Sequence, residues 1–153
     1  MPQRDLIVGP IDILNYIELF NESYARHALD PQRARKLVEV FYERFLSRSA
    51  RIRELFSQTD MQQQQVHLRR GLLTVGTFIT TGLRPTQELH RLARVHQAMG
   101  LTAADHQDWM DSLIAALSEV EPGMRPEVAD AWRICLAPAL TFMQLPVPNS
   151  DAA

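Results

Sequence analysis

Residues 86–100, TQELHRLARVHQAMG, decide the interpretation of this chain because they place a histidine on the apolar face of a predicted helix. Leu89, Leu92, Ala93 and His96 follow one another at positions i, i+3, i+4 and i+7, the spacing of one face of an α-helix. The side chain of His96 is therefore expected to point inward. By spacing alone, such a histidine is more often a hydrogen-bonded core residue than a ligand.

Helical periodicity recurs on both sides of this stretch, and no segment shows the clear period-two alternation of a half-buried strand. Asp30-Pro31 and the capping-box-like run Thr102 to Asp105 are typical helix starts. Gly71 and Gly76 lie inside one predicted helix, where each costs about 1 kcal/mol relative to alanine and indicates a close helix crossing. We therefore predict an all-α chain with helices at about 11–27, 31–46, 50–56, 59 or 60 to 79, 86–99, 102–122 and 126–145.

Length and composition bound the class of protein. The 153 residues suggest one domain, with an N-terminal extension at 1–10, the folded domain at 11–145 and a disordered tail at 146–153. A net charge of −2 is not that of a nucleic-acid-binding protein. The lone Cys135 excludes an intramolecular disulfide, and no stretch is apolar enough for a signal peptide or a membrane span. We expect a cytoplasmic protein.

Three blocks in this order resemble the globin family, and in particular the bacterial single-domain globins and the haem domain of flavohaemoglobins. The blocks are Phe41-Tyr42-Glu43-Arg44-Phe45-Leu46 with Arg51-Ile52-Arg53-Glu54-Leu55-Phe56, then Thr59-Asp60-Met61 with Gln64 and Leu68, and finally Leu92-Ala93-Arg94-Val95-His96 with Gly100-Leu101 and Ala131-Trp132. The likeness spans roughly residues 12–144. It implies a globin fold of about seven to eight helices packed around a pocket for haem b.

The resemblance also assigns roles to individual residues. His96 matches the proximal histidine that ligates the haem iron, and Phe56 matches the phenylalanine that packs against the porphyrin. Tyr42 and Gln64 match the polar groups on the gas-binding side, and Leu68 matches the apolar contact beside them. Without the resemblance, Tyr42 is an ordinary amphipathic core tyrosine and the run Gln62–Gln65 is a solvated helix face.

Three more residues complete the predicted haem site. The second ring nitrogen of the proximal imidazole needs an acceptor, and the carbonyl group of Leu92 or of Ala93, about one turn earlier, can supply it. Leu101 follows the glycine that ends the helix and is expected to contact the haem. His67 lies three residues after Gln64, where it can reach a haem propionate or, in a shifted register, become a sixth iron ligand. His90, Arg69, Arg70 and Arg94 are further propionate partners or simple surface groups.

The pattern departs from the flavohaemoglobins on the proximal side. Their tyrosine about ten residues after the proximal histidine is replaced by His106, and their glutamate near the end of the last helix by Leu145 and Pro146. Val95 stands where they have lysine. A strongly electron-donating, anionic imidazole is therefore not expected, which favours reversible ligand binding over catalysis.

The leading functional prediction is reversible binding of dioxygen or another diatomic gas, such as nitric oxide or carbon monoxide, for storage or delivery. A gas ligand that acquires partial negative charge would accept hydrogen bonds from Tyr42 and Gln64, each contributing about 1–3 kcal/mol. Whether the chain is an enzyme stays open, because the same residues suit a nitric-oxide dioxygenase with an external reductase. The sequence is also compatible with a gas sensor acting through a partner, or with a helical interaction module without haem. A monomer or a homodimer is expected.

Overall fold

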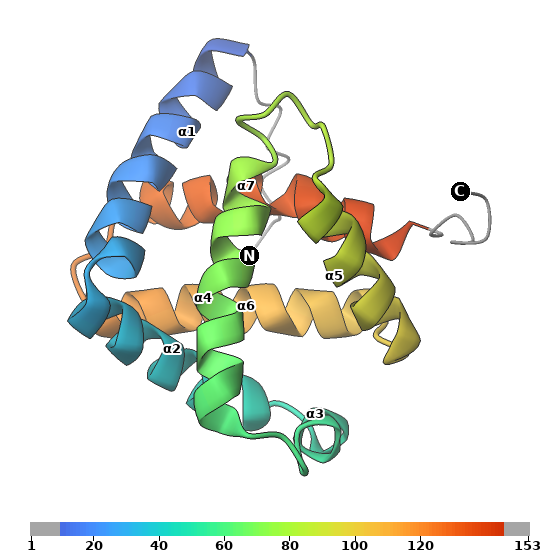
Figure 1. Ribbon diagram of the computed structural model, residues 1–153. Helices are drawn as coiled ribbons and strands as arrows, with labels where there is room; N and C mark the ends of the chain where they lie inside the picture. The colour runs from blue at the N-terminus through green and yellow to red at the C-terminus, as the bar shows by residue number, and fades with distance from the viewer. Residues whose placement is uncertain (1–9, 146–153) are drawn as a thin grey trace.

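The computed structural model describes residues 10–145, and within these residues the chain is helical and contains no strand. Figure 1 shows the arrangement, in which α4 crosses in front of α6. The elements are α1 (Pro10–Tyr24), the π-helix η1 (Ala25–Leu29), α2 (Pro31–Leu46), α3 (Ala50–Leu55), α4 (Met61–Thr77), α5 (Gln87–Ala98), α6 (Ala103–Val120) and α7 (Pro126–Gln144). The prediction of an all-α chain is confirmed.

The expected terminal segments, 1–10 and 146–153, lie outside the described residues except for Pro10. Pro10 is the first residue of α1, and proline suits the first turn of a helix, where its missing N–H has no partner to lose. None of the described helices combines the length and the apolarity needed to cross a membrane.

Side-chain caps fix the starts of five helices, including α3, where the hydroxyl oxygen of Ser49 accepts from the amide of Ile52. Asp30 accepts hydrogen bonds from the amides of residues 32 and 33 at the start of α2, and Asp60 does the same for residues 62 and 63 at the start of α4. Thr86 caps α5, and Thr102 and Asp105 form the reciprocal capping box predicted for α6. Each such cap is worth about 1 kcal/mol, so the local sequence specifies where these helices begin.

Two predicted helix ends differ from the structure. The first helix ends at Tyr24 and continues as the π-helix, which buries His27. The fourth ends at Thr77, so Ile79 lies in a turn. Near this end, the hydroxyl groups of Thr77, Thr80 and Thr81 donate to carbonyl oxygens three or four residues earlier. These side-chain hydrogen bonds compete with the backbone hydrogen bonds of a helix.

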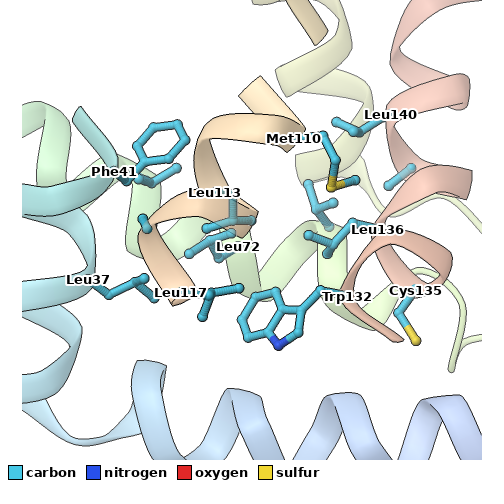
Figure 2. Packing of buried hydrophobic residues seen from close by; sticks show 14 of the residues in the cluster. Leu37, Phe41, Leu72, Met110, Leu113, Leu117, Trp132, Cys135, Leu136 and Leu140 are labelled. Carbon is cyan, nitrogen blue, oxygen red and sulfur yellow. The ribbon is translucent and has the colours of Figure 1, made fainter. Parts of the chain in front are cut away.

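The core lies between two pairs of helices, with α2 packed along α6 and α1 along α7. Trp132 is fully buried at its centre and meets the ring of Phe20 edge to face, with ring centroids 4.9 Å apart. Its indole N–H donates to the hydroxyl oxygen of buried Ser23 at 2.9 Å, so the one polar atom of the ring is satisfied. Figure 2 shows Trp132 beside Leu117 and Leu136, among other apolar side chains of α6 and α7.

The two glycines of α4 differ in their surroundings. A Cβ at Gly76 would lie 3.0 Å from Phe20 Cζ, whereas a Cβ at Gly71 would meet nothing within 4 Å. Phe20 is held by Trp132 and has little room to move. Only Gly76 is therefore explained by a close approach of α1, and Gly71 instead borders open space.

We expect Gly76→Ala and Gly71→Ala to change the stability of the haem-free protein in opposite directions. Gly76→Ala should destabilise it by about 1–2 kcal/mol, because overpacking against Phe20 outweighs the gain in helix propensity. Gly71→Ala should stabilise it by up to about 1 kcal/mol, because the propensity gain meets no clash. Urea denaturation of both variants measures the difference. A Gly76→Ala protein as stable as the Gly71→Ala protein would contradict the packing explanation.

A row of arginines ties α2 and α3 to α6. Arg44 donates to Glu119, Arg48 to Ser112 and Arg51 to Asp105, and the three α6 partners are spaced seven residues apart on one face of that helix. Arg51 also donates to the carbonyl oxygen of Gly100 at 2.8 Å, just beyond the end of α5. Through Arg51, the short α3 is thus held against the turn between α5 and α6.

We expect Arg51→Ala to destabilise the protein by about 1–2 kcal/mol, because it leaves the carboxylate of Asp105 buried with only Thr102 as a partner. Arg44→Ala is the matched control. Its pair with Glu119 is exposed on both sides and should contribute less than about 1 kcal/mol. If urea denaturation shows the same decrease in the free energy of unfolding for Arg51→Ala and Arg44→Ala, the burial of Asp105 does not add to the cost of losing its arginine partner.

Candidate haem site

A cavity of about 580 Å³ opens between α2, α3, α4, α5 and α6 and reaches α7. A volume of this size is typical of cofactor and ligand sites. All eight residues that the sequence predicted for the haem site line this one cavity: Tyr42, Phe56, Gln64, His67, Leu68, Leu92, His96 and Leu101. The structure therefore brings together residues that are up to 59 positions apart in the chain.

His96 lies in the last turns of α5, with its ring fixed by one hydrogen bond. Its Nδ1 is 2.6 Å from the carbonyl oxygen of Leu92, one of the two acceptors that the sequence predicted. Because a carbonyl oxygen can only accept, Nδ1 carries the proton and Nε2 of the neutral ring keeps its lone pair. An imidazole held in this way has the form in which histidine binds a metal ion.

His106 and Asp105 of α6 lie on the same side of the cavity as His96. The rings of His96 and His106 have centroids 6.3 Å apart. Burial lowers the pKa of His106, and the nearby His96 lowers it further. Burial alone would raise the pKa of Asp105, but hydrogen bonds from Arg51 and Thr102 hold it below its usual value. Asp105 is thus a carboxylate already committed to Arg51 and Thr102, and the acceptor for His96 is the uncharged carbonyl group of Leu92.

Tyr42 of α2 and Gln64 of α4 form a hydrogen-bonded pair in the cavity wall. The amide nitrogen of Gln64 donates to the hydroxyl oxygen of Tyr42 at 3.1 Å. Burial raises the pKa of Tyr42 to about 12, although the bond from Gln64 acts in the opposite direction. Tyr42 therefore stays protonated at neutral pH. Since its oxygen accepts from Gln64, its O–H is free to donate to a molecule in the cavity.

Aromatic and aliphatic side chains form the rest of the wall. Phe56, directly after α3, meets Tyr42 edge to face at 5.9 Å and Phe45 at 6.1 Å between centroids. Leu68 is buried one turn after Gln64. Phe45 and Trp109 also line the cavity. The interior is thus largely apolar, with polar groups from Tyr42, Thr59, Gln64, Asp105 and the histidines.

The mouth of the cavity carries charged and titratable groups, two of which no sequence pattern singled out. His67 and Arg70 lie on α4, and Glu88 and Arg91 on α5, all exposed. Arg91 donates to Glu88 at 3.0 Å. No motif marks Glu88 and Arg91, although their i, i+3 spacing predicts an ion pair on a helix surface. His67 is at the rim, where it is exposed to solvent.

The donor set of the cavity fits haem better than a bare metal ion. Within residues 10–145, no group of three or more His, Cys, Asp or Glu side chains is placed to hold a metal. A single oriented histidine can hold iron when the other equatorial ligands come with it, as in haem. Gly71 also lines the cavity, and the open space beside it leaves room for a flat ligand against α4. His96, Tyr42 and Phe56 are the residues that would surround such a group.

No family model matches the chain, and no curated protein matches it. A solved structure from Pseudomonas aeruginosa PAO1, of a protein described as structurally highly homologous to a human hemoglobin, does match. The two chains are 25% identical, the match covers 85% of this chain and 96% of the other, and the TM-score is 0.73. Together with the helix order and the cavity, this likeness shows that residues 10–145 adopt an all-α globin fold.

Proposed function

We propose that this chain is a haem protein that binds dioxygen or another diatomic gas reversibly, with His96 as the proximal ligand. The observation that carries the proposal is the pair of Tyr42 and Gln64 in the same cavity as His96. Haem, when bound, supplies an iron atom with one coordination position for the protein and one for a gas. The chain's own residues would hold the iron, orient the gas and exclude water.

The hydrogen-bond partner of His96 favours reversible binding over oxidative catalysis. A carboxylate on Nδ1 would make the imidazole a stronger electron donor, whereas the carbonyl group of Leu92 carries no net charge. Asp105 is occupied by Arg51 and Thr102, and burial disfavours the charged form of His106. The proximal side therefore contains no free anion to strengthen the imidazole among the residues that the structure describes.

Tyr42 and Gln64 would stabilise a bound gas that acquires partial negative charge. The O–H of Tyr42 and the second N–H of Gln64 are the donors available in the wall. Because the cavity is largely apolar, water competes weakly for these donors. Slow release of dioxygen is the expected consequence.

Repeated cycles of oxygenation and deoxygenation of the reduced, haem-loaded protein test the proposal. We expect the visible spectrum to return after each cycle, and carbon monoxide to displace dioxygen. Rapid irreversible oxidation in the first cycle would contradict reversible binding. Sustained consumption of nitric oxide in the presence of NADH and an added reductase would instead establish a nitric-oxide dioxygenase.

A further inference from the structure

The charges of the chain are distributed unevenly around the cavity. Residues 61–102, which comprise α4, α5 and the loop between them, contain five arginines and one carboxylate, Glu88, and so carry a charge of +4. The remaining residues carry eleven basic and seventeen acidic groups, a charge of −6. The part of the chain that frames the cavity mouth is thus basic, although the protein as a whole is acidic.

Most arginines of this segment have no carboxylate partner. Of the nine arginines that the structure describes elsewhere, four pair with a carboxylate, namely Arg26, Arg44, Arg51 and Arg133. Within the described residues, Arg91 is the only arginine of segment 61–102 that does so. The other four, which are all exposed, have no carboxylate within 4.0 Å in residues 10–145: Arg69, Arg70, Arg84 and Arg94.

Exposed apolar side chains concentrate in the same segment. Of the eight large apolar residues that the described structure exposes, five belong to it: Val66, Leu73, Leu83, Val95 and Met99. Val95 is 43% and Met99 38% exposed, and both lie at the cavity mouth beside Arg91. Arginine and methionine are enriched in protein interfaces, whereas aspartate, which is depleted there, does not occur between residues 61 and 102. Unpaired arginines around exposed apolar groups are thus the composition of a docking surface rather than of a solvated face.

We infer that the exposed faces of α4 and α5, with the loop between them, form a docking surface for a protein with an acidic face. A second copy of this chain does not fit, because a two-fold contact through this surface would bring two basic segments together. Nucleic acid would match the charge but not the apolar residues at the cavity mouth. Figure 1 shows α4 crossing the near side of the molecule with α5 beside it. Because exposed Arg70 of α4 and Arg91 of α5 line the cavity, a partner docked on these helices would lie next to it. The access of the docked partner to haem rests on the proposed function, whereas the docking surface itself does not.

Binding of flavodoxin, a small acidic redox protein, tests the inference. We expect flavodoxin to bind the full chain at an ionic strength of about 20 mM and to bind about tenfold more weakly at 150 mM, where surface charges are screened. Backbone amide shifts in nuclear magnetic resonance spectra should map the contact to α4 and α5. The basic redox protein cytochrome c, offered under the same conditions, should not bind there.

Charge reversal away from the cavity provides the decisive variants. Arg69→Glu with Arg94→Glu should weaken flavodoxin binding at least about tenfold, because both residues are exposed on the two helices of the proposed surface and neither lines the cavity. Arg35→Glu with Arg125→Glu makes the same change in charge on α2 and at the start of α7, and should weaken binding less than about twofold. Circular dichroism establishes that both variants fold.

The inference is overturned if flavodoxin does not bind at low salt or if the two double variants bind it equally. Duplex DNA that binds more tightly than flavodoxin at 150 mM salt, or a dimer that Arg69→Glu with Arg94→Glu dissociates, would also overturn it. Haem uptake, recorded on the same samples, is a separate result. A chain that takes no haem but binds flavodoxin at α4 and α5 would refute the proposed function and leave the docking surface standing.

Discussion

Tyr42→Phe is expected to accelerate the release of dioxygen from the haem-loaded protein by about ten- to a hundredfold. The change removes one hydroxyl group and keeps the ring that packs against Phe41 and Phe56. A hydrogen bond to a charged acceptor contributes about 1.5–3 kcal/mol, and each 1.4 kcal/mol is a factor of ten in rate or affinity. Stopped-flow mixing of the oxygenated protein with carbon monoxide measures the release rate.

Tyr24→Phe is the matched control for this measurement. The pKa of Tyr24 is also raised by burial, but this residue packs against Phe20 and Trp132 and does not line the cavity. Its loss should leave the release rate unchanged. If Tyr42→Phe and Tyr24→Phe release dioxygen equally slowly, the hydroxyl group of Tyr42 is not a donor to the gas.

His96→Gly is expected to weaken haem binding by more than about a hundredfold. Even residues that only support a metal ligand typically cost 10–100-fold when they are changed, and His96 would be the ligand itself. The glycine leaves space for a free imidazole molecule, which should restore both haem retention and the ferrous spectrum. Transfer of haem to an excess of a scavenger protein measures retention with and without imidazole.

His90→Gly separates loss of a ligand from damage to α5. His90 lies on the same helix, with its ring against Phe142, and does not line the cavity. We expect it to keep haem and to gain nothing from imidazole. An effect of His90→Gly as large as that of His96→Gly would indicate that glycine in α5, rather than the missing ligand, releases the haem.

Much of the fold was predictable because it is specified locally. Asp30, Asp60 and Thr102 cap helices where the sequence placed them, and the inward face of α5 follows from its apolar spacing. The π-helix around His27 was not predictable from periodicity, because apolar spacing does not distinguish an α-turn from a wider one. The Nε2 atom of His27 is buried and makes no hydrogen bond to the described residues, and the Glu121 carboxylate lies 3.6 Å from it, a contact that a sequence pattern does not reveal.

The predicted site residues share one cavity, but its rim could not be predicted. Tyr42 and Gln64 come from helices separated by α3, and only a family pattern relates them before the fold is known. The contacts of Arg51 with Asp105 and Gly100 span about 50 residues, so no local rule predicts them. Gly71 and Gly76 also look equivalent in the sequence. Their surroundings differ because Phe20 of α1 lies beside Gly76 and no side chain lies beside Gly71.

Titration of the haem-free protein with haem tests the central claim most directly. Trp109 lines the cavity, whereas Trp132 is buried in the core, so quenching of the fluorescence of Trp109 reports entry of haem. We expect quenching and the visible band both to saturate at one haem per chain, and His96→Ala to abolish the band of the ligated ferrous form. Binding that does not saturate, or a spectrum that His96→Ala leaves unchanged, would contradict a haem held in this cavity by His96.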